Sequence, residues 1–163
     1  MAIAPACCTA GVTLELAALS LDDLDWLEGW FPTVAASVGY AHTSEEVVAP
    51  DGRALHARKI VADGVAAGVI VWRVRHVDIR EAIVEFVGVP SALARVGIGL
   101  RAAALLEDEL RALGVHTLYA PAPAMHGIAL YFWIRLGYRP LLRDAWPSSR
   151  DGVAWLSRRI DRA

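Results

Sequence analysis

The feature that most constrains the fold is a buried strand that leads, through a short loop, into a helix that begins with glycine. Residues 82–89 are rich in branched apolar side chains, which favours a strand, and a Gly-x-Gly sequence at 97–99 opens the apolar spacing of a helix predicted over 97–113. A short strand predicted over 116–120 follows that helix. The second half of the chain therefore predicts a strand–helix–strand crossover, which places a helix on one face of a sheet.

The rest of the chain adds an antiparallel meander and further helices. Apolar alternation predicts strands over five more ranges: 12–16, 55–62, 65–76, 138–142 and 153–160. Helical spacing predicts three more helices: one from 22 or 23 to 31, one over 33–40 after Pro32, and one over 125–136. Residues 42–53 are polar and are predicted to be a loop, Asp63-Gly64 is a hairpin turn signal, and another turn is predicted near 77–78.

These elements predict a single α/β (α+β) domain over residues 1–163. Its sheet is mixed and mostly antiparallel, with six to seven strands flanked by about four helices, and residues 1–11 form a loose N-terminal arm. The chain is 56% hydrophobic with a formal charge of -2, which allows a packed core but gives no steering toward nucleic acid or an anionic membrane. The two cysteines are adjacent, without zinc-ligand spacing, so we expect no metal and a cytoplasmic location.

The loop and helix start at 95–100 have the properties of an anion site. The first amides of a helix have no partner within the helix and favour a negative group. Gly97 and Gly99 allow close backbone approach, and Arg95 adds a positive charge. A plain tight turn with close packing is the alternative, because Gly-x-Gly at a helix start is common. The pattern is neither a Walker loop nor a dinucleotide fingerprint, since no Gly-Lys-Ser/Thr follows and the third glycine is absent.

Two motifs in this region resemble the GNAT family of N-acetyltransferases, over about residues 59–143. Val89 matches the end of the family's fourth strand, and 94–99 matches its Arg/Gln-x-x-Gly-x-Gly/Ala loop, with Ala94 at the first position. The stretch 126–138 is similar to Asn-x-x-Ala-x-x-Phe-Tyr-x-x-x-Gly-Phe, with His126 in place of Asn and Trp133 in place of Tyr.

This resemblance implies fourth and fifth strands that splay apart, with acetyl-coenzyme A as acyl donor inserted between them and no metal. The implied coenzyme A–binding residues lie on the fourth strand, on the following loop and helix start, and on the later helix: Val87, Val89, Arg95, Val96, Gly97, Ile98, Gly99, Leu100, Ala129, Phe132 and Trp133.

Glu85 is the candidate catalytic base. A carboxylate in the middle of an apolar strand is costly unless it is paired or faces a cleft. It lies four residues before Val89, so strand alternation predicts that both face the same side. In the family a Glu on this strand often serves as base, and a structural ion pair is the alternative. Glu81 shares the face of Glu85 and is the reserve candidate.

The general acid is left open, because the family's tyrosine is replaced by Trp133. An indole N–H can donate a hydrogen bond but does not release its proton in this role. Trp133 packs on the pantetheine while solvent protonates the thiolate, or His126 acts as the catalytic acid, or catalysis is lost. A histidine at 126 also fits a surface or supporting role. Tyr131 is expected to face elsewhere, since two residues along a helix rotate the side chain by roughly 200°.

Two further groups bear on the site. Pro121 and Pro123 follow the predicted strand at 116–120, and because proline removes backbone donors, strand pairing is predicted to end there. Aromatic side chains gather in the first helices, where they serve the core or, as the family implies, an acceptor pocket: Trp26, Trp30, Phe31 and Tyr40.

The function implied by the resemblance is transfer of an acetyl group from acetyl-CoA to a primary amine by direct attack. The acceptor is expected to be a small-molecule amine or a peptide, with neither nucleic acid nor a membrane as partner. The sequence shows no large acidic patch, which argues weakly against a polycationic acceptor. The alternative is a non-catalytic acyl-CoA–binding or sensing domain of the same fold, acting through a homodimer.

Overall fold

A seven-stranded sheet organises the described part of the chain. The computed structural model describes residues 11–50, 55–76, 80–148 and 151–161. The strands lie in the order β1-β2-β3-β4-β5-β7-β6. Their bounds are β1 Leu14–Ala18, β2 Leu55–Ala62, β3 Val65–His76, β4 Glu81–Gly88, β5 Thr117–Pro123, β6 Arg139–Pro140 and β7 Val153–Arg159. Neighbouring strands are antiparallel except β4 and β5, which are parallel, so the predicted mixed sheet is confirmed.

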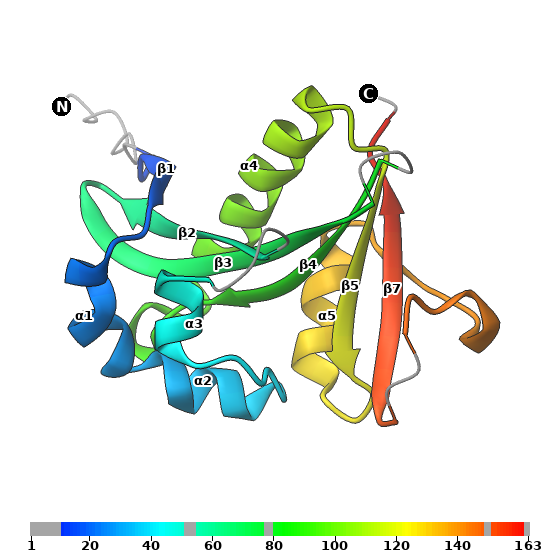
Figure 1. Ribbon diagram of the computed structural model, residues 1–163, viewed down its shortest axis with the longest axis horizontal. Coiled ribbons are helices and arrows are strands. Elements are labelled where there is room, and N and C mark those ends of the chain that lie inside the picture. Colours follow the sequence, from blue (N-terminus) through cyan, green and yellow to red (C-terminus); the bar gives the residue numbers. More distant parts are fainter. Residues whose placement is uncertain (1–10, 51–54, 77–79, 149–150, 162–163) are drawn as a thin grey trace, which may run out of the picture.

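Five α-helices cover the two faces of this sheet in the described residues. They are α1 Leu24–Glu28, α2 Phe31–Ser37, α3 Ser44–Val48, α4 Ile98–Ala112 and α5 Gly127–Arg135. Helices α1 to α3 lie on one face, and α4 and α5 lie on the other (Figure 1). Each face has its own apolar core: Phe31, Val47 and Phe86 belong to the first, and Leu106 and Leu118 belong to the second.

Local sequence signals explain several element boundaries. Asp63 and Gly64 both have positive φ, 50° and 80°, as a tight β2–β3 hairpin requires, and β2 and β3 have the predicted bounds. Strand β1 begins two residues later than predicted, which preserves the face that each side chain occupies. Pro32 does not break a helix but lies in the first turn of α2, where its missing N–H has no partner to lose. The turn predicted near 77–78 and residues 1–10 of the predicted arm lie outside the described residues.

The prediction of a loop over 42–53 is wrong for its first half, because α3 forms there. Thr43 is the N-cap, and its hydroxyl accepts a hydrogen bond from the Glu46 N–H at 3.2 Å. The Glu46 carboxylate accepts in return from the Thr43 N–H at 2.8 Å, which completes a capping box. Val47 and Val48 are buried against the sheet. The Thr-x-x-Glu signal was present in the sequence, but it precedes only one helical turn.

Replacing Thr43 with alanine is expected to lower the free energy of unfolding by about 1 kcal/mol, because two capping hydrogen bonds lose their geometry. Urea unfolding followed by circular dichroism measures this change. The matched control is Thr33→Ala on exposed α2 surface, which should change stability little. Equal stability of Thr43→Ala and wild type would contradict the cap.

A buried carboxylate joins α4 to the far end of the sheet. Glu107 is 3% exposed, and its Oε2 lies 2.8 Å from Arg158 Nη1 on β7. Burial raises the pKa of the Glu107 carboxyl above its ordinary value of 4.5, although the Arg158 guanidinium offsets part of this effect. The folded protein therefore keeps a proton that the unfolded chain has already released. Consequently the free energy of unfolding falls as the pH rises from 4.5 through the raised pKa.

The variant Glu107→Gln is expected to lose this part of the pH dependence, because an amide does not titrate. Urea unfolding repeated from acidic to neutral pH measures it. Glu109→Gln is the control on the same helix, since Glu109 is exposed and pairs with Arg58 across 3.5 Å. A Glu107→Gln curve that still falls with pH as steeply as that of the wild type would contradict the assignment.

Candidate functional site

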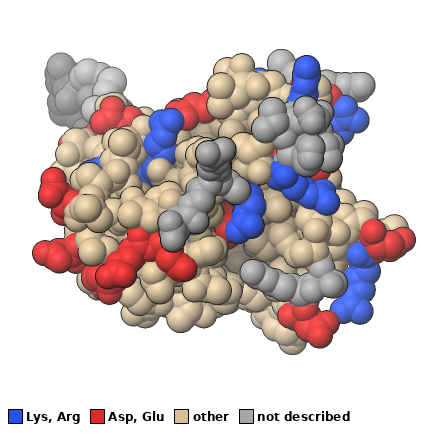
Figure 2. Space-filling view, in the orientation of Figure 1, with Lys and Arg blue, Asp and Glu red and all other residues tan. Residues whose placement is uncertain are grey.

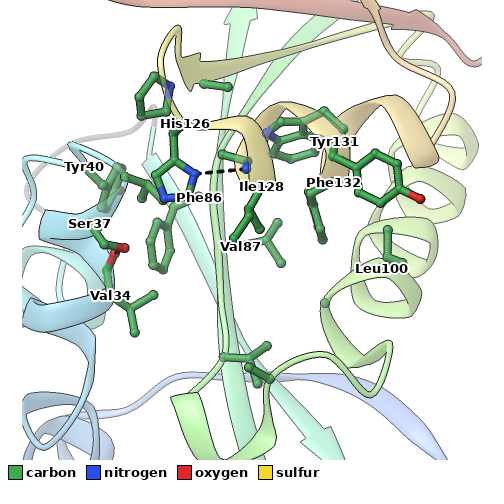
Figure 3. Close-up of a pocket in the computed structure, with 18 of the residues that line it drawn as sticks. Val34, Ser37, Tyr40, Phe86, Val87, Leu100, His126, Ile128, Tyr131 and Phe132 are labelled. Atoms are coloured by element: carbon green, nitrogen blue, oxygen red, sulfur yellow. Dashed lines mark hydrogen bonds between the residues drawn. The ribbon is translucent and has the colours of Figure 1, made fainter.

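A cavity of about 920 Å³ opens where β4 and β5 part. The two strands pair only from Glu81 opposite Thr117 to Ile83 opposite Tyr119, and both run on beyond that point. The predicted splay of the fourth and fifth strands is therefore confirmed. Every residue predicted for the site lines this one cavity: Glu85, Val87, Val89, Arg95, Val96, Gly97, Ile98, Gly99, Leu100, His126, Ala129, Phe132 and Trp133. Figure 3 shows the cavity between α5, α4 and the α2 side.

One end of the cavity is the N-terminus of α4. Gly97 is its N-cap, with φ 85°, and Arg95 also has positive φ, 68°, so the loop turns sharply into the helix. The Arg101 N–H is the first to bond within the helix, to the Gly97 carbonyl at 3.1 Å. The amides at 98–100 therefore have no acceptor within the helix, and its first turn contains no acidic residue. This end of the cavity is suited to a bound anion.

Gly99 allows three elements to approach closely beside these amides. A Cβ atom at Gly99 would lie 3.3 Å from Phe132 Cε2 on α5 and 3.5 Å from Val87 Cγ1 on β4. Any larger side chain would have to displace one of these two neighbours or extend into the cavity. The glycine thus lets α4, α5 and β4 approach one another closely where they line the cavity.

Pro121 and Pro123 shape the β5 wall of the cavity, and the prediction that pairing ends at them holds toward β4 but is wrong toward β7. Pairing with β7 continues through both residues to Val153. The Ala124 N–H bonds to Gly152 beyond β7, so the amides of even-numbered residues face β7. Proline nitrogens at odd positions therefore face the gap toward β4, where no donor is lost. Because they offer no N–H to β4, the prolines help to keep the two strands apart.

The strand that carries Glu85 contains a β-bulge. Val71 pairs with Phe86 and Trp72 pairs with Val84, so Glu85 is the extra residue. The bulge reverses which face the following side chains occupy. Phe86 packs with the core under α1 to α3, whereas Val87 packs against the core under α4. The prediction that Glu85 and Val89 share a face is therefore wrong, because it assumed uninterrupted alternation.

Glu85 also lines the cavity, and its side chain is 13% exposed. Its Oε1 is 2.5 Å from Arg73 Nε, and its Oε2 is 3.9 Å from His42 Nε2. The carboxylate thus forms an ion pair and also lines the cavity. Glu81, the reserve candidate, is outside the cavity lining; it accepts hydrogen bonds from Arg75 Nη1 at 3.0 Å and from the Tyr119 hydroxyl at 3.1 Å.

Tyr40 forms the wall opposite α5, on the α2 side (Figure 3). Its ring stacks on Phe86 with centroids 4.9 Å apart, and its hydroxyl is buried without a hydrogen-bond partner among the described residues. Burial, and next the charge of Glu85, raise the pKa of Tyr40. Phe31, from the same aromatic group, is wholly core. The sequence shows these aromatic residues only at helical spacing, which does not distinguish a residue of the core from one that lines the cavity.

His126 has a structural role at the start of α5. It is the N-cap, and its Nδ1 accepts a hydrogen bond from the Ala129 N–H at 3.1 Å (Figure 3). In the neutral ring the proton is therefore on Nε2. Trp133 is buried, with its ring 4.9 Å from that of Phe132. Tyr131 is 61% exposed and lies toward Leu100, away from His126 (Figure 3), but it also lines the cavity, so the expectation that it faces elsewhere is wrong.

Charge is divided unevenly around the cavity. The segment 11–50, which supplies the α2 wall, contains no Lys or Arg, and its acidic residues are Glu15, Asp22, Asp23, Asp25, Glu28, Glu45 and Glu46. Figure 2 shows acidic side chains gathered over α1 and α3. The expectation of no large acidic patch is therefore wrong, because the small net charge hides a local excess. Arg95 and Arg135 line the cavity on its other side.

Two classes of feature were not found in the part of the chain that the structure describes. No group of three or more His, Cys, Asp or Glu side chains there is arranged to hold a metal ion. No helix among those residues has the length and apolar character needed to cross a membrane.

Comparison with known proteins identifies the fold. No family model matches the sequence, and no curated protein matches it. Among solved structures, an acetyltransferase from Thermus thermophilus matches with a TM-score of 0.72 and 20% identity, over 90% of this chain and 97% of that one. The ribosomal-protein-S18-alanine N-acetyltransferase from Escherichia coli matches with a TM-score of 0.67 and 20% identity, over 93% and 96%.

A PaiA N-acetyltransferase from Thermoplasma acidophilum, solved in complex with coenzyme A, has a TM-score of 0.67 and 12% identity, over 90% of this chain and 99% of that one. An acetyltransferase of the GNAT family from Staphylococcus aureus has a TM-score of 0.72 and 11% identity, over 91% and 99%. These likenesses span nearly the whole length of both partners in each case. The chain therefore has the fold of the GNAT acetyltransferases, the acyl-CoA N-acyltransferase fold.

Proposed function

We propose that the protein is an N-acetyltransferase that transfers the acetyl group of acetyl-CoA to a primary amine. The observation that carries this proposal is a single cavity lined both by the unpaired amides of a helix N-terminus and by the Glu85 carboxylate. The amides suit a pyrophosphate, and the carboxylate suits an ammonium group. Beyond Ile83 the edge of β4 that faces β5 is unpaired, so the gap between the two strands is open along it.

The residues present fit coenzyme A. The amides at 98–100 would bind the pyrophosphate, with Arg95 nearby. The β4 edge at Val87 and Val89 would hold the pantetheine amides, and Ala129, Phe132 and Trp133 would flank the arm. Gly99 supports this fit, because a side chain there would narrow the same channel.

The chain's own residues would then position the acceptor and move protons. Glu85 takes a proton from the acceptor's ammonium group, which frees the nitrogen lone pair. The nitrogen–carbon bond to the acetyl group forms, the carbon–sulfur bond breaks, and the sulfur leaves as a thiolate. The nitrogen gives up its second proton to water, which leaves a neutral amide. That thiolate takes its proton either from solvent or from the Nε2–H of His126, since the Nδ1 atom of that ring accepts the capping hydrogen bond. Holding both reactants in one cavity supplies the proximity that the reaction needs.

The distribution of charge supports an amine as the acceptor. A primary amine is a cation at neutral pH. The acidic side chains gathered over α1 and α3 lie on the side of the cavity opposite Arg95 and Arg135. This uneven distribution of charge raises the local concentration of a cation on the acidic side, and the effect weakens as salt is added.

The alternative function is a non-catalytic acyl-CoA–binding domain, which Trp133 favours because it replaces the usual tyrosine. Calorimetric titration with acetyl-CoA, followed by a thiol-release assay with a panel of primary amines, separates the two. Binding followed by amine-dependent thiol release supports the transferase. Binding without release by any amine supports the binding domain, and a folded protein that does not bind acetyl-CoA contradicts both.

A further inference from the structure

We propose that His42 relays the proton that Glu85 takes from the acceptor, passing it out of the cavity to Glu46 and the solvent. The inference rests on the proposed acetyl transfer and adds a proton path to it. His42 was not a candidate from the sequence, where it stood only at the start of a predicted loop.

The geometry places the imidazole between two carboxylates. His42 Nε2 is 3.9 Å from Glu85 Oε2, and His42 Nδ1 is 3.4 Å from Glu46 Oε2. Exposure rises along this series: 13% for Glu85, 33% for His42 and 52% for Glu46. The three side chains therefore form a path from the cavity wall to the surface, with one ring nitrogen directed to each carboxylate.

The two oxygens of Glu85 have different neighbours. Arg73 Nε lies 2.5 Å from Oε1, so this oxygen is engaged in an ion pair. The other oxygen, Oε2, faces the His42 ring, whose Nε2 lies 3.9 Å away. The oxygen that is free to take a proton from the acceptor is therefore the one beside the imidazole.

The surroundings of the ring keep it in place. The Tyr40 ring lies 5.2 Å from it, on the cavity side, and stacks in turn on Phe86. On the outer side Glu46 is fixed by the α3 capping box, since its Oε2 also accepts from the Thr43 N–H. The charged and titratable groups around the imidazole are thus Glu85 on β4, Glu46 on α3, the Tyr40 phenol and, through Glu85, Arg73 on β3.

The proton transfers balance as follows. In the resting ring Nδ1–H faces Glu46 and the Nε2 lone pair faces Glu85. The ammonium proton moves to Glu85 Oε2 and then, through a water molecule that would bridge the 3.9 Å separation, to His42 Nε2, which makes the ring an imidazolium and restores the Glu85 carboxylate. The Nδ1 proton then leaves to Glu46 or to water, and exchange with water at the partly exposed ring restores the resting tautomer.

The test compares two acceptors that differ in whether they must lose a proton before the nitrogen can attack. A primary alkylamine is a cation at neutral pH, whereas a hydrazide of the same skeleton is neutral. For His42→Gln we expect kcat/KM with the alkylamine to fall roughly 10- to 100-fold, within the range of a lost acid–base step. The hydrazide should be spared, and the loss with the alkylamine should disappear at a pH at which that amine is already neutral. Glu46→Gln should give a smaller loss of the same kind, because glutamine keeps the capping hydrogen bond.

Controls separate a relay from a structural role. His56→Gln, on exposed β2 surface, should leave both acceptors unaffected. Acetyl-CoA affinity should be unchanged in His42→Gln, and free imidazole should restore part of the rate of His42→Ala. Equal losses with both acceptors, a loss that persists at high pH, or no loss at all would overturn the relay. Absence of amine-dependent thiol release by the wild type would instead overturn the proposed function, together with the relay that depends on it.

Discussion

The Gly99→Leu variant is expected to fold and yet to bind acetyl-CoA at least about 100-fold more weakly than the wild type, a loss of ~2.7 kcal/mol. The reason is space rather than backbone strain, because Gly99 lies inside a helix without positive φ. A Cβ there already lies 3.3 Å from Phe132 and 3.5 Å from Val87, so the rest of a leucine must enter the channel or push these walls apart. Calorimetry measures the affinity, and circular dichroism verifies the fold.

Gly127→Leu is the matched control for this variant. Gly127 also lies in the first turn of a helix, α5, but a Cβ at that position meets nothing within 4 Å. It should therefore bind acetyl-CoA with wild-type affinity. An unchanged affinity in Gly99→Leu would show that coenzyme A does not pass through the junction of α4, α5 and β4.

The second large effect is expected from Glu85→Gln, which keeps the shape of the side chain and removes its ability to accept a proton. We expect the rate of acetyl transfer to an alkylamine to fall by about 10²- to 10⁴-fold at neutral pH. Acetyl-CoA affinity should change little, because Glu85 is not among the residues proposed to bind coenzyme A. Thiol release under saturating acetyl-CoA measures the rate.

Glu81→Gln provides the comparison on the same strand. Glu81 is also a partly buried glutamate with an arginine partner, but it is held by Arg75 and Tyr119 outside the cavity. Its replacement should leave the rate within a few-fold of wild type. If the two variants lost activity equally, the effect of Glu85 would be structural and the role of base would fall.

The parts of the site that could be predicted from sequence are those encoded locally. At the α4 N-terminus, Gly97 adopts a positive φ, and Gly99 allows backbone and side chains to approach closely. Both requirements are visible in the sequence as a Gly-x-Gly pattern. The Asp63-Gly64 hairpin is a signal of the same kind, since both residues adopt the left-handed conformation that the turn requires.

The parts that could not be predicted depend on partners that are distant in the chain. The bulge at Glu85 cannot be recognised in the sequence of β4, because apolar residues occupy both faces of the strand and no alternation of apolar and polar residues is visible. The prolines at 121 and 123 are tolerated because of which edge of β5 faces the gap, which only the β7 register reveals. Tyr40 lines the cavity and His42 lies beside Glu85 because the α1–α3 layer folds back over β4.

The uneven distribution of charge also has a consequence for product release. Coenzyme A is a polyanion, so the arginines at one side of the cavity and the acidic helices at the other would bring two oppositely charged reactants in from different directions without competition. Acetylation turns a cationic amine into a neutral amide. For the cationic amine proposed as acceptor, the same electrostatic potential would not attract the acetylated product, which would therefore be bound less tightly than the substrate.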